Sequence, residues 1–436
     1  MSKVYADIIV DISQEKLDKS FQYEIPENLQ TQVEIGKKVL VSFGNGNRKI
    51  SGYVIGISDT PKLSPEKIKP VLEVVTQGIE IESHLIALAG WIAKNYGSTV
   101  NQALKTVLLV KEKASAKEKK YIRLLISKEE GQTYLEEFTR KHYLAKARLM
   151  EALLENQVLE YKEAMDTLKL SSSVIKGMEE KKLIAVERER LYRTPVPKDA
   201  QRGYEYQLSK EQKEVVSEIF KEWQQEQPRP CLIKGVTGSG KTQVYMELIE
   251  AVLKQGKQVI VLIPEIALTY QNVVRFYSRF GSCVSVINSR LSVGERFDQF
   301  ERAKKGEISV VIGPRSALFT PFPNLGLIII DEEHEDSYKS EKTPCYHARE
   351  TAVQRGKMES ARVVMGSASP SVDSYYRGKA GEYQLLYLNE RYGGKELPEV
   401  EIVDLKAELK TGNRSIFSHV LTEKLEERLQ KKEQSI

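Results

Sequence analysis

The sequence predicts an α/β multidomain protein in which a small N-terminal β domain and a helical middle domain precede a parallel-sheet lobe. Short apolar segments separated by turn residues run from 4 to 75, which is typical of a β domain. Strands and helices alternate from about 205 to 395, which indicates a parallel sheet with helices on both faces. The predicted strands of this region are PCLIKG, QVIVLIP, CVSVIN, ISVVIG, LGLIIID and ARVVMGS. A glycine-rich loop, GVTGSGKT, lies at 235–242 within that alternation.

The bulk composition narrows the class of protein. A chain of 436 residues provides roughly three domains. Its net charge of +5 argues against a uniformly basic coat protein but permits local basic surfaces that bind nucleic acid. Its three cysteines, Cys231, Cys283 and Cys345, form no CxxC pair, so neither a disulfide framework nor a zinc ribbon is indicated. Because no apolar run approaches the roughly 20 residues of a membrane span, we expect a cytoplasmic protein that does not contact a membrane.

The N-terminal domain is predicted at 1–110. Five strand-like segments follow one another: VYADIIV, SFQYEI, KKVLVSF, ISGYVIGI and PVLEVV. The sequence GNGN at 44–47 suits a tight hairpin, so we expect a small β-barrel-like domain or a sandwich. A helix follows that ends near Gly97, with an apolar face formed by Leu85, Leu88, Trp91 and Ile92.

The middle of the chain is predicted to be a linker and a helical domain. Residues 111–120, KEKASAKEKK, have no large apolar side chain, which is typical of a linker. Short helices follow in 121–200, and Ser171–Ser173 offer an N-cap for one of them. The last helix precedes an alternating strand in LIAVERERLYR, so the order suggests a winged-helix domain. Such domains bind protein as well as DNA, and a plain helical spacer remains an alternative.

The loop GVTGSGKT follows a strand and opens a helix, which is the context that a P-loop requires. Lys241 can reach the β and γ phosphates of ATP, and the Thr242 hydroxyl can hold Mg²⁺. The phosphates are expected to lie against the backbone N–H groups of the loop, which comprises Gly235, Val236, Thr237, Gly238, Ser239 and Gly240.

A cluster of acids follows three isoleucines in IIIDEEHEDSYK, at the expected carboxyl end of a buried strand. Ligands bind at that end of the strands in open α/β sheets. We expect this strand to neighbour the P-loop strand, with Asp331 holding Mg²⁺ and Glu332 orienting or deprotonating the attacking water. Lys241, Asp331 and Glu332 are therefore the predicted catalytic residues for ATP hydrolysis. The alternative is a pair of surface acids.

Several long motifs resemble those of one family. LIPEIALTYQ at 262–271, GPRSALFTPF at 313–322 and GSASP at 366–370, together with the P-loop and DEEH, are similar to the motifs of superfamily 2 helicases. A more specific resemblance is to the primosomal protein N′ family of bacterial replication-restart DNA helicases. It rests on the residues of PEIALT, of GPRSALF, and of DEEH followed by SYK and YHARE. The resemblance runs from about residue 4 to the end. Ser369 stands where the family usually has Thr.

The resemblance implies an ATP-dependent 3′-to-5′ DNA helicase that recognises stalled or abandoned replication forks and initiates primosome assembly. Its expected partners are branched and single-stranded DNA, the nascent leading-strand 3′ end, single-stranded DNA-binding protein and other primosomal proteins. Residues 201–395 then form a RecA-like first helicase lobe, and 396–436 begin a second lobe. The family's zinc-binding cysteines and arginine finger are expected beyond Ile436, so this chain is expected to hydrolyse ATP feebly. A non-catalytic nucleotide- and fork-DNA-binding module is the alternative.

The resemblance also implies roles for residues of the helicase lobe. Gln212 is similar to an adenine-reading glutamine, with a solvated residue at a helix start as the alternative. Segment 337–349 resembles an aromatic-rich loop that couples DNA contact to the ATPase site, through Tyr338, Lys339, Tyr346, His347 and Arg349. Contacts to the DNA backbone are expected from Thr269, Arg315 and Ser316, and helix capping or a surface loop are the alternatives.

In the N-terminal domain the resemblance implies a pocket for the terminal nucleotide of a 3′ end. Its expected lining is Phe21, Gln22, Tyr23, Gly44 and Lys69. Aromatic rings can stack on a base, and a lysine can offset phosphate charge. Gln22 stands where well-known members carry an acid, which puts selectivity for a free 3′ end in question. A core role for Phe21 and Tyr23 is an equal alternative.

Overall fold

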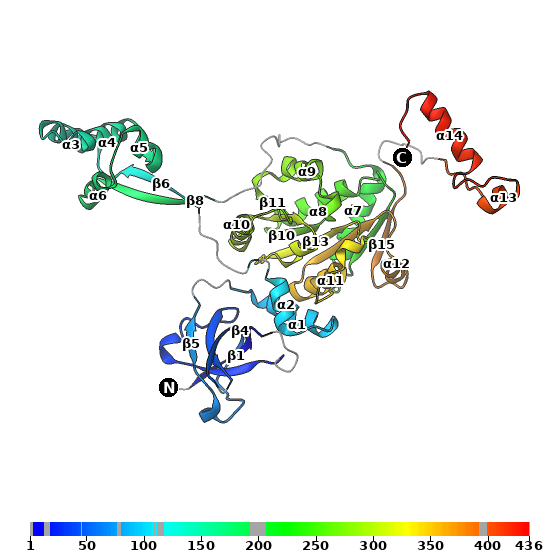
Figure 1. The fold of residues 1–436 in the computed structure, drawn as a ribbon, viewed down its shortest axis with the longest axis horizontal. Coiled ribbons are helices and arrows are strands. Elements are labelled where there is room, and N and C mark those ends of the chain that lie inside the picture. The colour runs from blue at the N-terminus through cyan, green and yellow to red at the C-terminus, as the bar shows by residue number, and fades with distance from the viewer. Residues whose placement is uncertain are drawn as a thin grey trace. The chain divides into compact units, whose positions relative to one another are not determined.

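The computed structural model describes residues 3–12, 18–44, 46–75, 80–108, 110, 117–191, 206–391 and 399–435 (Figure 1). The chain divides into two compact units at Asn389 and Glu390. Three predicted limits, the linker at 111–116, the boundary near 200 and the boundary near 395, lie outside the described residues. No helix in the described ranges is long and apolar enough to cross a membrane.

The N-terminal β domain is a five-stranded antiparallel sheet with the order β2-β1-β4-β3-β5. Its strands are β1 (Val4–Val10), β2 (Phe21–Ile25), β3 (Lys38–Phe43), β4 (Arg48–Ser58) and β5 (Val71–Val74). The two edge strands approach each other, because the Glu24 backbone N–H donates to the Lys69 carbonyl at 2.9 Å and Glu24 bridges Pro70. The sheet therefore curls into a half-barrel, as the five apolar segments predicted.

Two helices follow the half-barrel, where the sequence predicted one. Helix α1 (Ser83–Asn95) buries Leu85, Leu88 and Ile92, while Trp91 is only partly buried. The second helix, α2 (Val100–Val107), begins with a capping box between Thr99 and Gln102. The core of these helices continues into the helicase lobe, since it also contains Phe319 and Tyr346.

The middle segment is a three-stranded antiparallel sheet with helices packed around one core. Its elements are β6 (Lys117–Leu124), α3 (Lys128–Arg140), α4 (Leu144–Glu155), β7 (Val158–Glu160), α5 (Tyr161–Thr167), α6 (Ser172–Glu180) and β8 (Ile184–Leu191). Strand β6 pairs with β8 from Lys117 opposite Leu191 to Leu124 opposite Ile184. Residues 117–120 are therefore strand, and their assignment to the linker was wrong because ladder pairing outweighs their lysine-rich composition. The winged-helix assignment stays a prediction.

The lobe at 206–389 is built on a parallel sheet of seven strands, with the order β11-β12-β10-β13-β14-β9-β15. The strands are β9 (Cys231–Gly235), β10 (Gln258–Leu262), β11 (Val284–Val286), β12 (Val310–Gly313), β13 (Leu325–Asp331), β14 (Arg362–Ser367) and β15 (Gln384–Leu388). The sequence predicted the first six. Strand β15 was missed because it lies at an edge of the sheet and its residues are only partly buried.

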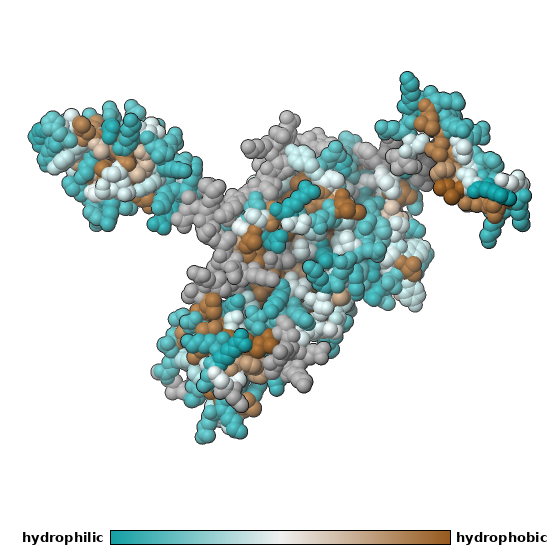
Figure 2. All heavy atoms as spheres, in the orientation of Figure 1, coloured by the Kyte–Doolittle hydropathy of each residue, from teal (hydrophilic) through white to brown (hydrophobic). Residues whose placement is uncertain are grey.

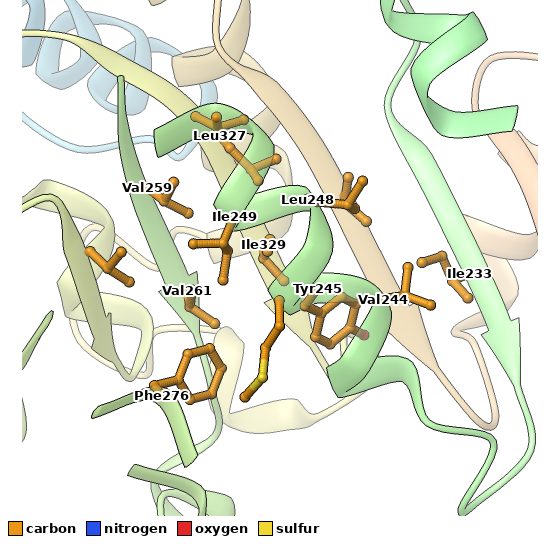
Figure 3. Close-up of a cluster of buried hydrophobic side chains, with 14 of the residues drawn as sticks. Ile233, Val244, Tyr245, Leu248, Ile249, Val259, Val261, Phe276, Leu327 and Ile329 are labelled. Atoms are coloured by element: carbon orange, nitrogen blue, oxygen red, sulfur yellow. The ribbon is translucent and has the colours of Figure 1, made fainter. Parts of the chain in front are cut away.

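Helices cover both faces of this sheet. They are α7 (Lys210–Trp223), α8 (Lys241–Lys254), α9 (Tyr270–Phe280), α10 (Val293–Lys304), α11 (Ala348–Glu359) and α12 (Val372–Lys379). One core cluster joins α7, α8 and α9 to strand residues such as Val261 and Ile329 (Figure 3). The other joins α10 and α11 to Ile260 and Ile330, so successive strand residues serve opposite faces.

The second unit contains α13 (Leu405–Lys410) and α14 (His419–Gln430), and neither helix buries a residue. Figure 2 shows hydrophobic side chains on its surface, and Ile402, Ile416 and Leu429 are among those that are exposed. Its assignment as the start of a second helicase lobe stays a prediction.

Candidate functional site

The P-loop connects the end of β9 to the start of α8, as predicted. Gly238 and Gly240 both have φ of +81°, a backbone conformation that side chains disfavour. A Cβ on Gly240 would also lie 2.2 Å from Gln212 Nε2, so the loop tolerates only glycine there without rearrangement. The loop backbone thus turns tightly into α8, and the N-terminus of this helix is a favourable place for a phosphate.

Two side chains of the loop fit a phosphate ligand. Lys241 is buried, and its Nζ donates to the Gly235 carbonyl at 2.9 Å, which leaves further donors on the ammonium group. The Ser239 hydroxyl is buried and has no hydrogen-bond partner among the residues that the structure describes. An unsatisfied buried hydroxyl costs free energy, and a bound phosphate oxygen is a partner that could satisfy it.

Gln212 is buried, so the alternative of a solvated residue at the helix start was wrong. Its Oε1 accepts from the Ser209 N–H at 2.9 Å, which caps α7, and its Nε2 donates to the Ser239 carbonyl at 2.8 Å. Gln212 therefore ties the start of α7 to the P-loop. A role in reading adenine stays a prediction.

Asp331 lies at the carboxyl end of β13, as expected, but β13 is not the direct neighbour of the P-loop strand. Strand β14 lies between β13 and β9, so the prediction of adjacent strands was wrong. The Tyr245 hydroxyl donates to Asp331 Oδ1 at 3.0 Å, and the Tyr338 hydroxyl donates to the Asp331 carbonyl at 2.7 Å. Burial raises the pKa of the Asp331 carboxyl to about 6, and the charge of Glu332 adds to this effect.

The residues after Asp331 are held in a strained turn. Glu332 has φ of +46°, which is uncommon for a residue with a side chain and is typical of functional sites. Its carboxylate lies 3.6 Å from His334 Nδ1, and that nitrogen is 2.7 Å from the Ser367 hydroxyl. The Ser367 hydroxyl also accepts from the Ser369 N–H at 3.0 Å. The acid motif is thereby joined to GSASP.

The structure brings together a buried ion pair that the sequence did not indicate. Glu333 is fully buried, and Arg349 Nη1 lies 2.8 Å from its carboxylate. The same carboxylate accepts from the Ser371 N–H at 2.7 Å and from the Ser374 hydroxyl at 2.8 Å. Glu350 completes the set by accepting from Arg349 Nε at 3.0 Å. Arg349 is thus a structural bridge between the acid motif, α11 and α12.

Three residues predicted to contact DNA are buried in this structure. Tyr338, Tyr346 and Arg349 are 1%, 3% and 5% exposed, so the expectation that they present surfaces to bases or phosphates is not met. The rings belong to the hydrophobic core, and the guanidinium is held by acids. In contrast, Lys339 is exposed and lies over the Tyr96 ring at 5.2 Å, and His347 is half-buried. Both remain candidates for DNA contact.

The other predicted DNA contacts lie in surface turns of the lobe. Arg315 is half-buried, and its Nη1 donates to the carbonyls of Ser337 and Lys339, the first at 3.1 Å. Ser316 is half-buried beside it. Thr269 is exposed and caps α9, because its hydroxyl accepts from the Asn272 N–H at 3.4 Å. The alternative of capping is therefore present at Thr269, and its DNA contact stays a prediction.

In the N-terminal domain the five predicted pocket residues do not share one face of the sheet. Phe21 and Tyr23 pack in the core of the half-barrel. Side chains alternate along a strand, so Gln22 points to the other face. There it bonds the turn after β4, donating to the Thr60 carbonyl at 3.1 Å and accepting from the Lys62 N–H at 2.6 Å.

The other two members of the expected pocket contact each other. Lys69 Nζ donates to the Gly44 carbonyl at 2.7 Å and to Asn47 Oδ1 at 2.8 Å, which ties the hairpin loop to the residues before β5. Gly44 has φ of +68° and open space around its missing side chain. This space is where a ligand could approach the backbone, so the structure keeps Gly44 and Lys69 together.

A P-loop lobe with an acid motif and an attached β domain defines the class of the protein as a P-loop nucleotide-binding protein of the helicase type. Two family models match the chain: the 3′ DNA-binding domain over residues 7–109, and the res subunit of type III restriction enzymes over residues 205–368. The chain is a homologue of the replication restart protein PriA.

The similarity to that protein extends over nearly the whole chain. The protein of that name from Bacillus subtilis is 35% identical over 99% of this chain, and the one from Chlamydia trachomatis is 35% identical over 100%. The chain spans 61% and 58% of their lengths. RecG bound to a three-way DNA junction matches 44% of this chain at 24% identity with a TM-score of 0.34, and no argument rests on that likeness.

Proposed function

We propose that the chain supplies the nucleotide-binding lobe and the DNA-end-binding domain of an ATP-dependent 3′-to-5′ DNA helicase that restarts stalled replication forks. The observation that carries this proposal is the convergence of the P-loop and the acid motif at one edge of a parallel sheet. The matching 3′ DNA-binding domain at residues 7–109 supports the DNA substrate. The family resemblance of the sequence motifs supports the direction of movement.

The residues present fit ATP with Mg²⁺. The described residues contain no group of three or more His, Cys, Asp or Glu side chains that could hold a metal ion. Mg²⁺ bound with a nucleotide needs only one or two protein ligands, because phosphates and waters complete its shell. Asp331 and the Thr242 hydroxyl would be those ligands, and the cation would neutralise charge on the phosphates.

Each residue of the site then has a distinct task. Lys241 binds the terminal phosphates, and the backbone of 235–240 fixes their orientation. Glu332 orients the attacking water or accepts its proton, and the strained backbone at this position fixes the direction of its carboxylate. His334 links Glu332 to Ser367, so a movement of the Glu332 side chain can be transmitted to the GSASP segment.

The partners and the cellular location follow from the family alone. We expect branched and single-stranded DNA with a nascent 3′ end, single-stranded DNA-binding protein and primosomal proteins as partners, in the cytoplasm. The resemblance places an arginine finger in a second lobe, and such a group is worth about 10³ to 10⁵ in rate. A polypeptide of residues 1–436 is therefore expected to bind nucleotide but to hydrolyse ATP slowly.

The experiment measures binding before turnover. Purified residues 1–436 are titrated with a fluorescent ADP in the presence of Mg²⁺, and then with forked DNA whose 3′ end is free or blocked. Binding of both ligands, with a preference for the free end, supports the proposal. Failure to bind nucleotide removes it. Binding of both ligands without DNA-stimulated turnover above the Glu332→Gln background, even in a chain extended by a second lobe, would favour the non-catalytic module.

A further inference from the structure

Tyr245 connects the two halves of the nucleotide site. It lies on α8, four residues after the P-loop lysine, and Figure 3 shows it among the buried side chains under that helix. Its hydroxyl donates to Asp331 Oδ1 at 3.0 Å. The helix that starts at the P-loop is therefore joined directly to the strand that ends in the acid motif.

A glycine on the intervening strand makes this contact possible. Strand β14 separates β13 from β9, and its Gly366 is paired with Asp331 on one side and with Ile233 on the other. A Cβ on Gly366 would lie 1.8 Å from the Tyr245 hydroxyl oxygen. The missing side chain therefore opens a passage through which the tyrosine hydroxyl crosses β14 and reaches Asp331.

Asp331 is held on both its main chain and its side chain. Tyr338 fixes the carbonyl, and Tyr245 occupies Oδ1 of the carboxylate. Within the described residues, Tyr245 is the side chain that hydrogen-bonds this carboxylate, and the neighbouring Glu332 N–H adds a backbone hydrogen bond to it. A carboxylate rotates broadly about its last torsion unless a partner fixes it, so the bond from Tyr245 determines which oxygen is presented to a ligand.

We propose that Tyr245 is a positioning residue that turns Oδ2 of Asp331 toward the Mg²⁺ of the bound nucleotide. The inference rests on the proposed function, because it assumes that this site binds a magnesium nucleotide. Mg²⁺ demands near-ideal octahedral geometry, so its affinity depends on the orientation of each protein ligand. Tyr245 acts through Asp331, because the hydrogen bond that its hydroxyl donates goes to that carboxylate and not to the P-loop.

The test separates metal affinity from nucleotide affinity. Residues 1–436 are loaded with fluorescent ADP, and the Mg²⁺ concentration at half-saturation is measured for the parent chain and for Tyr245→Phe. Since a hydrogen bond to a charged group is worth about 1.5–3 kcal/mol, we expect half-saturation to rise roughly tenfold or more. The affinity for ADP in EDTA should stay unchanged.

Tyr277→Phe is the matched control. Tyr277 belongs to the same core cluster and is 2% exposed, and within the described part of the chain its buried hydroxyl has no hydrogen-bond partner. Removing that hydroxyl should leave the Mg²⁺ dependence at the parent value. If the loss of a buried hydroxyl from this core were the only cause, both substitutions would change the Mg²⁺ half-saturation concentration alike.

A second variant tests the passage through β14 and keeps the hydroxyl. Gly366→Ala places a methyl group where the Tyr245 hydroxyl lies, so it should also raise the Mg²⁺ half-saturation concentration. In the Tyr245→Phe background the clash is much smaller, because the nearest ring atom is then 3.0 Å away, a tight contact that a small shift of the ring can accommodate. The two substitutions should therefore be strongly non-additive.

The outcomes are distinguishable. A rise in Mg²⁺ half-saturation for Tyr245→Phe but not for Tyr277→Phe supports the inference. No rise, or an equal loss of ADP affinity in EDTA, overturns it. If Tyr245→Phe does not fold, Gly366→Ala decides by the same two measurements. A parent chain that binds no nucleotide would instead contradict the proposed function itself.

Discussion

The nucleotide site of the lobe and the expected 3′-end pocket of the N-terminal domain differ in how well their predicted residues converge. In the lobe, the P-loop and Asp331 meet at the carboxyl edge of one parallel sheet, and Tyr245 joins them. In the N-terminal domain, Gln22 and Tyr23 point to opposite faces of one strand and each is bonded internally. Parallel strands bring their ends to one edge, whereas consecutive residues of a single strand diverge.

We therefore expect substitutions of polar residues to cost different amounts of stability in the two regions. In the lobe, polar groups are buried and paired, so removing one leaves an uncompensated partner. In the N-terminal domain, Lys69 is the charged residue of the expected pocket, and its hydrogen bonds lie at the surface, where pairing contributes little.

The largest effect is expected for Arg349→Ala. This change leaves the carboxylate of the fully buried Glu333 without its counter-ion, which typically costs about 3–5 kcal/mol. Urea unfolding followed by alkylation of Cys231 measures the cost, since burial raises the pKa of that thiol to about 12 and protects it in the folded lobe. Lys3→Ala, which breaks an exposed pair with Glu24, should leave the unfolding midpoint almost unchanged. Equal losses of stability for the two variants would contradict the expected difference between the lobe and the N-terminal domain.

Lys241→Ala should weaken the binding of ADP with Mg²⁺ by about 10- to 100-fold, since hydrogen bonds to charged groups are worth about 1.5–3 kcal/mol. Calorimetry on residues 1–436 measures the change. Lys234→Ala is the matched control, because Lys234 lies on β9, the strand that leads into the P-loop, and its Nζ lies over the Tyr375 ring at 4.9 Å from the ring centroid. The P-loop assignment does not survive if both variants bind like the parent.

Gln22→Asp introduces the acid that the family resemblance implies at this position and should destabilise the N-terminal domain by roughly 1–2 kcal/mol. The Thr60 carbonyl loses its donor, and the new carboxylate lies across from Asp7 on β1. Urea unfolding followed by circular dichroism measures the cost. Gln30→Asp, at an exposed turn position, should stay within about 0.5 kcal/mol. A stabilised Gln22→Asp variant would show that the turn at 58–62 rearranges around an acid.

Lys69→Ala should weaken DNA binding modestly and reduce the slope of affinity against salt concentration by about 1, as expected for one phosphate contact. The measurement uses residues 1–436 and duplexes with free or blocked 3′ ends. Lys67→Ala, in the same loop and exposed, is the control. An unchanged slope for Lys69→Ala would assign Lys69 to loop structure alone, through Gly44 and Asn47.

The smallest effect concerns pH at the contact between α1 and the lobe. Burial lowers the pKa of His84, and the Glu359, Glu82 and Arg355 charges face it. A histidine with a lowered folded pKa binds protons more readily when unfolded, so its contribution to stability is lost as pH falls below about 6.5. The urea midpoint should therefore decrease from pH 7 to pH 5.5. In His84→Gln the decrease should be smaller, and an identical decrease would exclude His84 as a cause.

The sequence predicted most of the fold because its patterns are local. Strands β1–β5 and β9–β14 were found from apolar runs between turn residues, and the P-loop and Asp331 from their positions at strand ends. Tyr245 was missed because its partner lies 86 residues away, on a strand whose place in the sheet the sequence order does not reveal. The burial of Tyr338 and Tyr346 was missed for a related reason. The sequence of an aromatic-rich loop is the same whether its rings face the solvent or the core.

The pairing of Lys117 with Leu191 has a consequence for how the chain was assembled. Paired strands lie about 4.8 Å apart, so the middle segment begins and ends at neighbouring points in space. A folded segment with adjacent ends can be gained, lost or exchanged in evolution without separating the sequences that flank it. The core shared by α1, Phe319 and Tyr346 joins the flanking sequences independently. The segment 117–191 therefore leaves and returns at neighbouring points, while the parts before and after it contact each other without it.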